Sequence, residues 1–144
     1  MQLIVNSNCA ELAKKNGPAH IAFTIGALPP AIADYSAMGQ VWQNLISNAI
    51  KYSAGAQRPA IEIGAEERQN TITYYIKDNG VGFDMRYYDK LFGIFQRLHS
   101  QTNYEGIGIG LATAQRIIVK HGGTIWAEGK VGEGAVFYFS LPKS

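Results

Sequence analysis

The sequence predicts a two-layer α/β sandwich, in which a mixed, mostly antiparallel sheet carries about three helices on one face. Three segments, near residues 2–15, 34–52 and 106–121, repeat apolar residues at helical spacing. Five other segments alternate apolar and polar residues as strands do, near residues 21–25, 61–63, 71–77, 124–128 and 135–141. A chain of 144 residues has the usual size of one domain, so we expect one core over residues 1–144.

Charge and cysteine content argue against several classes of function. The net charge of +2 is small and the 13 Lys and Arg residues are scattered, which does not fit a nucleic-acid partner. The single cysteine, Cys9, cannot form an internal disulfide, and no Cys/His cluster has metal-ligand spacing. No apolar run reaches the ~18 residues of a membrane span. We therefore expect a cytoplasmic domain without direct membrane contact, whose parent protein is either membrane-bound or soluble.

The chain begins with a predicted amphipathic helix over residues 2–15, whose apolar positions are Leu3, Ile4, Leu12 and Ala13. No N-cap residue precedes this helix, which is the pattern of a cut end inside a longer protein. A strand around Phe23 follows, and Asp34 is then a candidate N-cap for the next helix.

The helix after Asp34 has the clearest periodicity, and it carries two different faces. Its apolar stripe consists of Met38, Val41, Trp42, Leu45, Ile46, Ala49 and Ile50. Its polar stripe consists of Asn44, Asn48, Lys51 and Tyr52, whose spacing of four, three and one residues places them on one face. Most asparagines on helices are solvated surface residues, so these amides alone indicate no function.

The strand over residues 71–77 ends on the carboxylate of Asp78. Ile72, Tyr74 and Ile76 share one face at period two, and Asp78 is the next residue on that face, so we expect it to point inward. An inward carboxylate needs good hydrogen-bond donors, and the exocyclic amine of a purine is one such donor. The alternative interpretation is that Asp-Asn-Gly is only a hairpin turn.

Residues 84–105 are a predicted lid. This segment lacks periodicity over most of its length, and so long a connection usually has a function. Gly106, Gly108 and Gly110 then stand where a helix begins, where unpaired N–H groups and the helix dipole favour an anion such as phosphate. Neither the dinucleotide fingerprint nor a Walker sequence is present. A flexible hinge is the alternative interpretation of these glycines.

Four stretches, taken in order, resemble the boxes of a known family. They are QNLISNAIKYS at 43–53, DNGVGF at 78–83, LFGIFQR at 91–97 and GIGIGLA at 106–112. They resemble the N box, first glycine box, F box and second glycine box of the ATP-binding catalytic domain of sensor histidine kinases. That domain has the Bergerat (GHKL) fold, shared with type II topoisomerases, heat-shock chaperones and mismatch-repair ATPases. Residues 95–100 and 104–106 are also similar to light-sensing, phytochrome-like kinases.

For the base of the nucleotide, the resemblance implies that Asp78 accepts a hydrogen bond from the adenine amine. Gly80 and Gly82 would shape the wall beside the base. Tyr52 would lie along the base or the ribose, and Asn48 would be the ligand of Mg²⁺.

For the phosphates, the resemblance implies that Asn44, Lys51 and Arg97 are the catalytic residues. Asn44 and Lys51 would support the phosphates from the helix, and Arg97 would reach the γ-phosphate from the lid. The second glycine box would close on the phosphate chain, through Gly106, Gly108, Gly110 and Leu111.

The last glycines of the chain depart from the family's pattern. Gly132 and Gly134 resemble a final glycine box, but Ala135 and Val136 follow them, where the family often has a hydroxyl residue. This end of the chain is therefore interpreted as structural.

The phosphoacceptor of these kinases is a His followed by an acidic residue on a separate dimerising helix. His20, His99 and His121 stand elsewhere in the pattern, and the first and last are interpreted as structural or solvated residues. The implied partners are accordingly a histidine-bearing dimerisation domain of the parent kinase and a downstream response regulator.

The function implied is transfer of the γ-phosphoryl group of Mg-ATP to that histidine, and two alternatives stand beside it. An ATPase of the same fold is the first, but those ATPases place a glutamate at the position of Asn44, and a neutral amide cannot take a proton from water. A module that senses ATP without catalysis is the second, and an assay with a phosphoacceptor domain separates it from a kinase.

Overall fold

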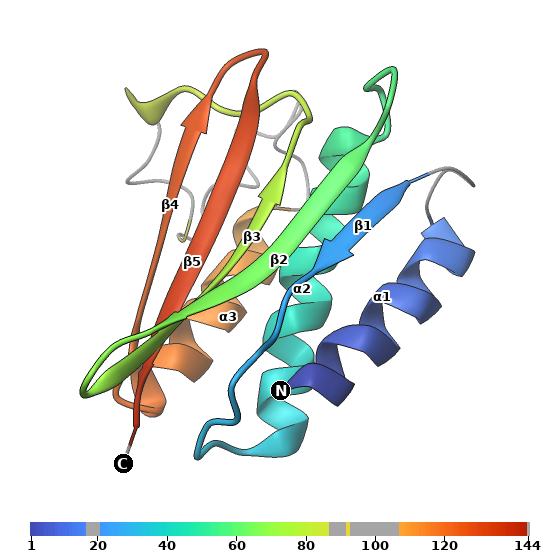
Figure 1. The fold of residues 1–144 in the computed structure, drawn as a ribbon. Coiled ribbons are helices and arrows are strands. Elements are labelled where there is room, and N and C mark those ends of the chain that lie inside the picture. The colour runs from blue at the N-terminus through green and yellow to red at the C-terminus, as the bar shows by residue number, and fades with distance from the viewer. Residues whose placement is uncertain (17–20, 87–91, 93–106, 144) are drawn as a thin grey trace.

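The computed structural model describes residues 1–16, 21–86, 92 and 107–143, and these form a five-stranded sheet with three helices on one face (Figure 1). The elements are α1 (Gln2–Asn16), β1 (Ala22–Ile25), α2 (Tyr35–Ser53), β2 (Ala60–Glu67), β3 (Thr71–Asp78), α3 (Ile107–Lys120), β4 (Thr124–Lys130) and β5 (Gly134–Pro142). The predicted α/β sandwich is confirmed.

The strand order in the sheet is β1-β2-β3-β5-β4. β1 runs parallel to β2, and the other neighbouring strands are antiparallel, so the sheet is mixed and mostly antiparallel as predicted. β3 is the central strand, and its last residue, Asp78, is paired with Ile61 on one side and Ala135 on the other. Asp78 is therefore held in register by two neighbouring strands.

The core lies between the sheet and the helices. All seven residues of the apolar stripe predicted for α2 are buried. Trp42 from this stripe packs edge-on against Phe139 of β5, with 5.1 Å between ring centroids, and Phe139 stacks on Tyr74 of β3 at 5.2 Å. Such aromatic pairs stabilise the packing beyond the area that they bury. They fix α2 against β5 and against β3, the strand that ends at Asp78.

The ends of α2 and α3 are tied together by side chains. The Asp34 carboxylate accepts a 2.7 Å hydrogen bond from the Ala37 amide, which confirms the predicted N-cap. His121 follows α3, and its Nδ1 lies 2.8 Å from the Ile117 carbonyl oxygen while its Nε2 accepts from the Asp34 amide at 3.2 Å. His121 is thus a structural residue that joins the end of α3 to the start of α2.

The face of the sheet opposite the helices carries a row of aromatic rings. Trp126 stacks on Tyr138 at 5.3 Å, and Tyr138 lies 6.4 Å from Tyr75. These rings are half-buried, in contrast to the buried aromatics on the helix side.

Within the described part of the chain, no helix combines the length and apolar character that a membrane crossing needs.

Candidate functional site

The candidate site is at the end of the sheet where β3 stops. Asp78 is only 6% exposed, which confirms the inward direction that the strand phase predicts. Its Oδ1 accepts a 2.8 Å hydrogen bond from the Gly80 amide. The strands that pair with β3 are β2, which precedes it, and β5, which begins only at Gly134, so the described strands form no hairpin at Asp78 and Gly80.

The Asp78 carboxylate is electrostatically unusual. Burial raises its pKa to about 6, although backbone hydrogen bonds from Gly80 and Ala135 act in the opposite direction. A buried carboxylate is costly unless donors compensate for lost hydration. At neutral pH the Asp78 side chain is therefore mostly an ionised acceptor in a poorly hydrated position. A hydrogen-bond donor from a ligand is more favourable there than beside a fully hydrated carboxylate.

Asp78 faces a small cavity of about 20 Å³. The residues around it come from α2, the β3 end and β5, and they are Asn48, Tyr52, Asp78, Gly82, Phe83, Ala135 and Phe137. This volume is room for a single water molecule. A ligand larger than water therefore needs this cavity to widen.

Asn48 contributes an unpartnered polar group to this cavity. Its Nδ2 atom is buried and has no hydrogen-bond partner among the described residues. Buried amide groups are rarely left unsatisfied, so the group fits either a water or a ligand acceptor. The cavity thus offers one donor from Asn48 and one acceptor from Asp78, which is the pairing that the edge of a purine ring can satisfy.

Glycines allow three chain segments to meet around Asp78. A Cβ on Gly80 would lie 2.0 Å from the Tyr52 carbonyl oxygen, and the Val81 amide donates to that same oxygen at 3.1 Å. Gly134 has φ +109°, and a Cβ there would lie 2.1 Å from the Asp78 carbonyl oxygen. The fold itself therefore requires these two glycines, apart from any role toward a ligand.

Asn79 has a structural role that its sequence context does not reveal. Its Oδ1 accepts from the Ala60 amide at 2.9 Å, and its Nδ2 donates to the Arg58 carbonyl at 2.8 Å. Both contacts join the end of β3 to the start of β2. Asn79 therefore faces away from the cavity that its neighbour Asp78 lines.

The predicted polar face of α2 is divided between two surroundings. Asn48 and Tyr52 line the cavity with Asp78. Asn44, one turn earlier, lines a separate groove between α1 and α2. Lys51 is exposed, and its Nζ lies 5.7 Å from the centre of the Tyr52 ring. The structure therefore gathers two of these four residues around Asp78.

The second glycine box is only partly described. Gly108 and Gly110 lie in the first turn of α3, which confirms that a helix begins there. Leu111 is fully buried in the core, so it anchors the start of α3 against the sheet. Gly106 and Arg97 lie outside the described residues, as does most of the predicted lid over residues 84–105.

Sequence reasoning missed three residues of the cavity wall. Ala135 and Phe137 enter it because β5 pairs with β3 and turns these side chains to the helix side. Phe83 is 3% exposed, and its ring occupies the space that a Cβ on Gly129 would take. The alternation of residues 135–141 was the available signal, but it does not show which strand is the neighbour.

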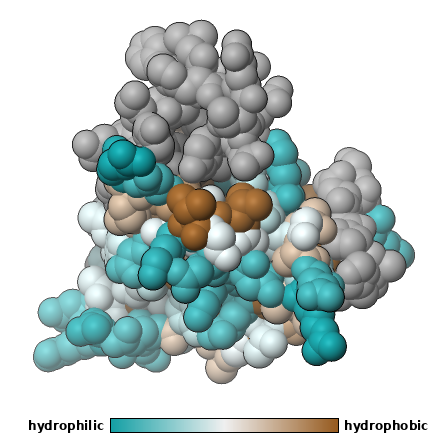
Figure 2. All heavy atoms as spheres, turned by 90° about the horizontal axis from the view of Figure 1, so that it is seen from above, coloured by the Kyte–Doolittle hydropathy of each residue, from teal (hydrophilic) through white to brown (hydrophobic). Residues whose placement is uncertain are grey.

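The surface above the cavity is partly apolar. Figure 2 shows hydrophobic side chains in the middle of a largely hydrophilic surface at this end of the molecule. Val81 is 39% exposed and Val131 66% exposed, and the Gly132 amide donates to the Val81 carbonyl, which brings the two segments together. Two exposed apolar side chains thus lie on the segments that follow β3 and β4.

The described residues do not form a metal cage. No group of three or more His, Cys, Asp and Glu residues in this part of the chain could hold a metal ion. Asn48 offers one amide oxygen at most. This donor set fits an ion such as Mg²⁺ only when a ligand's phosphates supply most of its other oxygens.

Comparisons with known proteins agree with this geometry. A model of the family described as histidine kinase-, DNA gyrase B-, and HSP90-like ATPase matches residues 33–144. The phytochrome-like protein Cph1 of Synechocystis sp. is 39% identical over 142 residues, which cover 99% of this chain and 19% of that protein. Cyanobacterial phytochrome A of Nostoc sp. is 45% identical over 115 residues, covering 80% and 15%. The predicted similarity to phytochrome-like kinases is confirmed.

Solved structures show the same fold. The catalytic domain of histidine kinase ThkA is similar with a TM-score of 0.81 and 26% identity, covering 99% of this chain and 93% of that one. ThkA in complex with the response regulator protein TrrA is similar with a TM-score of 0.79 and 24% identity, covering 100% and 40%. The chain spans less than a fifth of the length of the two phytochrome relatives.

Proposed function

Because the chain belongs to the family of histidine kinase-, DNA gyrase B- and HSP90-like ATPases, we propose that it is the ATP-binding catalytic domain of a sensor histidine kinase. In this proposal the domain binds Mg-ATP and transfers the γ-phosphoryl group to a histidine on a separate dimerisation domain. A response regulator then receives the phosphoryl group. ThkA, which has been solved with its response regulator protein, supports this last step by analogy.

The observation that carries the proposal is the pairing of Asp78 with Asn48 across one cavity. The Asp78 carboxylate accepts a hydrogen bond from the exocyclic amine of adenine, and the unpartnered Asn48 Nδ2 donates to a water beside the base. Tyr52 and Phe83 cover the base, and Gly82 lies in the cavity wall beside it. Because the cavity holds about 20 Å³, it must widen to admit the base.

The phosphates lie toward the start of α3 in this proposal. The backbone N–H groups of its first turn and the helix dipole favour an anion, and Gly108 and Gly110 let it approach closely. Asn44 and Lys51 support the phosphates from α2, and Arg97 and Gly106 complete the site. Asn48 would offer its Oδ1 to Mg²⁺, which would neutralise phosphate charge when bound.

Asn44 and the histidines of the chain favour transfer of the phosphoryl group to another domain over hydrolysis of ATP. Asn44 is a neutral amide, so it can orient an acceptor but cannot remove a proton from water. His121 cannot serve as the acceptor without breaking its contacts to Ile117 and Asp34. His20, His99 and His121 all stand outside the phosphoacceptor pattern of the sequence. The proposed acceptor is therefore a histidine on another domain, and the chemistry at this site is positioning and charge neutralisation. A cytoplasmic location, where ATP is available, belongs to the same proposal.

Labelling with γ-labelled ATP tests the proposal. The chain alone should bind ATP but neither label itself nor release phosphate quickly. Addition of the histidine-bearing dimerisation domain, produced separately, should give labelled domain at a rate that rises as its concentration approaches the roughly millimolar level of a tethered pair. Rapid phosphate release by the chain alone would instead identify an ATPase. ATP binding without transfer at any partner concentration would identify a sensing module.

A further inference from the structure

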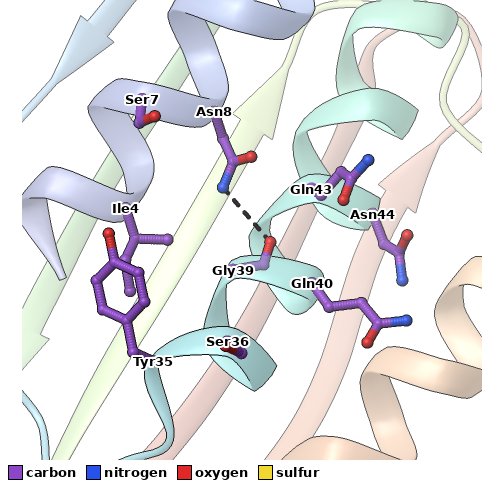
Figure 3. A pocket seen from close by; sticks show the side chains of 9 residues that line it. All are labelled: Ile4, Ser7, Asn8, Tyr35, Ser36, Gly39, Gln40, Gln43 and Asn44. Carbon is purple, nitrogen blue, oxygen red and sulfur yellow. Dashed lines mark hydrogen bonds between the residues drawn. The ribbon is translucent and has the colours of Figure 1, made fainter.

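A groove of about 640 Å³ lies between α1 and the first half of α2 (Figure 3). It is separate from the cavity around Asp78 and much larger. Asn8 of α1 reaches across it, and its Nδ2 donates to the Gly39 carbonyl of α2 at 3.4 Å. Ile4 and Tyr35 lie at the end of the groove near the start of α2.

The lining of this groove is polar but uncharged. The polar side chains that line it are amides and hydroxyls, from Ser7, Asn8, Ser36, Gln40, Gln43 and Asn44. None of the described lining residues is Asp, Glu, Lys or Arg. Amides and hydroxyls pair with the polar groups of a protein surface, whereas a free anion or cation would find no opposite charge here. The chemistry therefore fits a polypeptide partner rather than a small ion.

Gly39 is one of the residues that line the groove, and the described fold gives no reason for a glycine there. A Cβ built on Gly39 meets nothing within 4 Å, unlike Cβ atoms built on Gly80 or Gly134. Glycine inside a helix costs about 1 kcal/mol relative to alanine. The missing side chain leaves the α2 backbone open at this point, which permits the close approach of another backbone.

The groove leads directly to the proposed catalytic face. Asn44 lines its far end, and Asn48 of the Asp78 cavity is the next residue on the same face of α2. At 1.5 Å of rise per residue, Asn44 lies about 6 Å along the helix axis from Asn48 and about 12 Å from Ser36. An elongated partner seated in the groove would thus place its leading side chain beside Asn44.

We propose that this α1–α2 groove is the docking site for a helix of the phosphoacceptor domain, with the acceptor histidine at the Asn44 end. The inference rests on the proposed function and adds the surface that the partner uses. A helix fits a furrow between two helices, and its polar side chains pair with the amide rim while its backbone approaches Gly39. Continuity with the catalytic face distinguishes this occupant from an unrelated protein.

Filling the groove at Gly39 tests this proposal. Gly39→Leu should fold, because the site is open and leucine is a better helix former than glycine. Gly55→Leu is the matched control, since a Cβ on Gly55 also meets nothing within 4 Å and Gly55 does not line the groove. ATP affinity is measured by calorimetry, and transfer from γ-labelled ATP is measured against the concentration of the separately produced dimerisation domain.

For Gly39→Leu, the partner concentration that gives half-maximal transfer should rise about tenfold or more, as for loss of one important interface contact. ATP affinity should not change, and Gly55→Leu should behave as the unaltered chain. Gln43→Ala, which removes a rim amide without adding bulk, should shift the same partner concentration in the same direction by a smaller factor. Because the lining is uncharged, the ratio between Gly39→Leu and the unaltered chain should not depend on salt.

Equal partner dependence in Gly39→Leu and the unaltered chain would overturn the docking site while leaving the kinase proposal in place. Absence of transfer by the unaltered chain would overturn both. A Gly39→Leu effect on the oligomeric state of the chain alone, with no effect on transfer, would assign the groove to a second copy of the chain and would also overturn the proposal.

Discussion

The polar face of α2 borders two hollows, the cavity around Asp78 and the α1–α2 groove, which differ in volume and in charge. Asn48 and Tyr52 line a cavity of about 20 Å³ that contains the buried Asp78 carboxylate. Asn44, one turn earlier, lines an uncharged groove of about 640 Å³. The first suits one small ligand with a hydrogen-bond donor, and the second suits a larger polar surface. Residues that look equivalent on a helical wheel are therefore placed in different surroundings by what packs opposite them.

The glycines beside the two hollows also differ, because Gly80 is tightly packed and Gly39 is open. The largest predicted effect comes from the tightly packed one. Gly80→Ala places a Cβ 2.0 Å from the Tyr52 carbonyl oxygen. The Cβ position is fixed by the backbone at residue 80 and the oxygen belongs to the backbone of α2, so neither atom can move away easily. We expect it to lower the free energy of unfolding by about 3 kcal/mol or more, as severe overpacking does. Chemical denaturation measures the loss. Stability equal to that of the unaltered chain would show that the β3 end and α2 are not packed as described.

Asp78→Asn should separate ligand binding from stability. The change replaces a charged acceptor by a neutral amide, which should weaken ATP binding by on the order of 1.5–3 kcal/mol, or roughly ten- to hundredfold. The same change should stabilise the domain without nucleotide at neutral pH, by on the order of 2 kcal/mol, because it removes a buried charge. Calorimetry and denaturation of one preparation measure the two effects. Unchanged ATP affinity would remove Asp78 from base recognition.

The pH dependence of that stability difference follows from the raised pKa. An Asp whose folded-state pKa is about 6 binds its proton more tightly when folded than when unfolded, where the pKa is about 4. Its contribution to stability is therefore fully present below about pH 4 and is lost as pH rises through 6. The advantage of Asp78→Asn should accordingly be largest above pH 6 and should vanish below pH 4. An advantage that is constant over this range would mean that Asp78 is not a buried acid.

ATP affinity should show the opposite dependence on pH. The ionised Asp78 is a stronger acceptor for the adenine amine than the protonated acid, so binding should weaken by up to about tenfold between pH 7.5 and pH 5. Titration calorimetry at several pH values measures this. Asp78→Asn is the control, because any pH dependence that remains in it comes from the nucleotide or from other groups. The same loss in both proteins would contradict the assignment.

The contrast between the two hollows also shows what the sequence can predict. Periodicity predicts the α2 stripe and the inward phase of Asp78, because burial of one face is a local property of a helix or strand. It does not predict that Ala135 and Phe137 complete the cavity wall, because this depends on the pairing of β5 with β3, about 60 residues away in the chain. The groove is likewise invisible in the sequence, since it arises from the packing of α1 on α2.

Glycines also show the difference between what the sequence predicts and what only the packing reveals. In the sequence, Gly80 and Gly82 indicate a ligand wall, and Gly39 is one residue within a helical pattern. The structure shows that Gly80 is required by a contact with the Tyr52 backbone and that Gly39 is required by no described contact. A motif can therefore identify where a site is while leaving open whether a particular glycine serves the fold or a partner.

The smallest predicted effect has the opposite sign to the largest. Gly39→Ala adds a Cβ that meets nothing within 4 Å, and alanine favours a helix over glycine, so the domain should gain about 1 kcal/mol of stability. Thermal or chemical denaturation measures this gain. One methyl group fills little of a 640 Å³ groove, so partner-dependent transfer should fall less than in Gly39→Leu. A loss of stability in Gly39→Ala would mean that this glycine serves the fold as Gly80 does, and the difference between the two hollows would then not extend to their glycines.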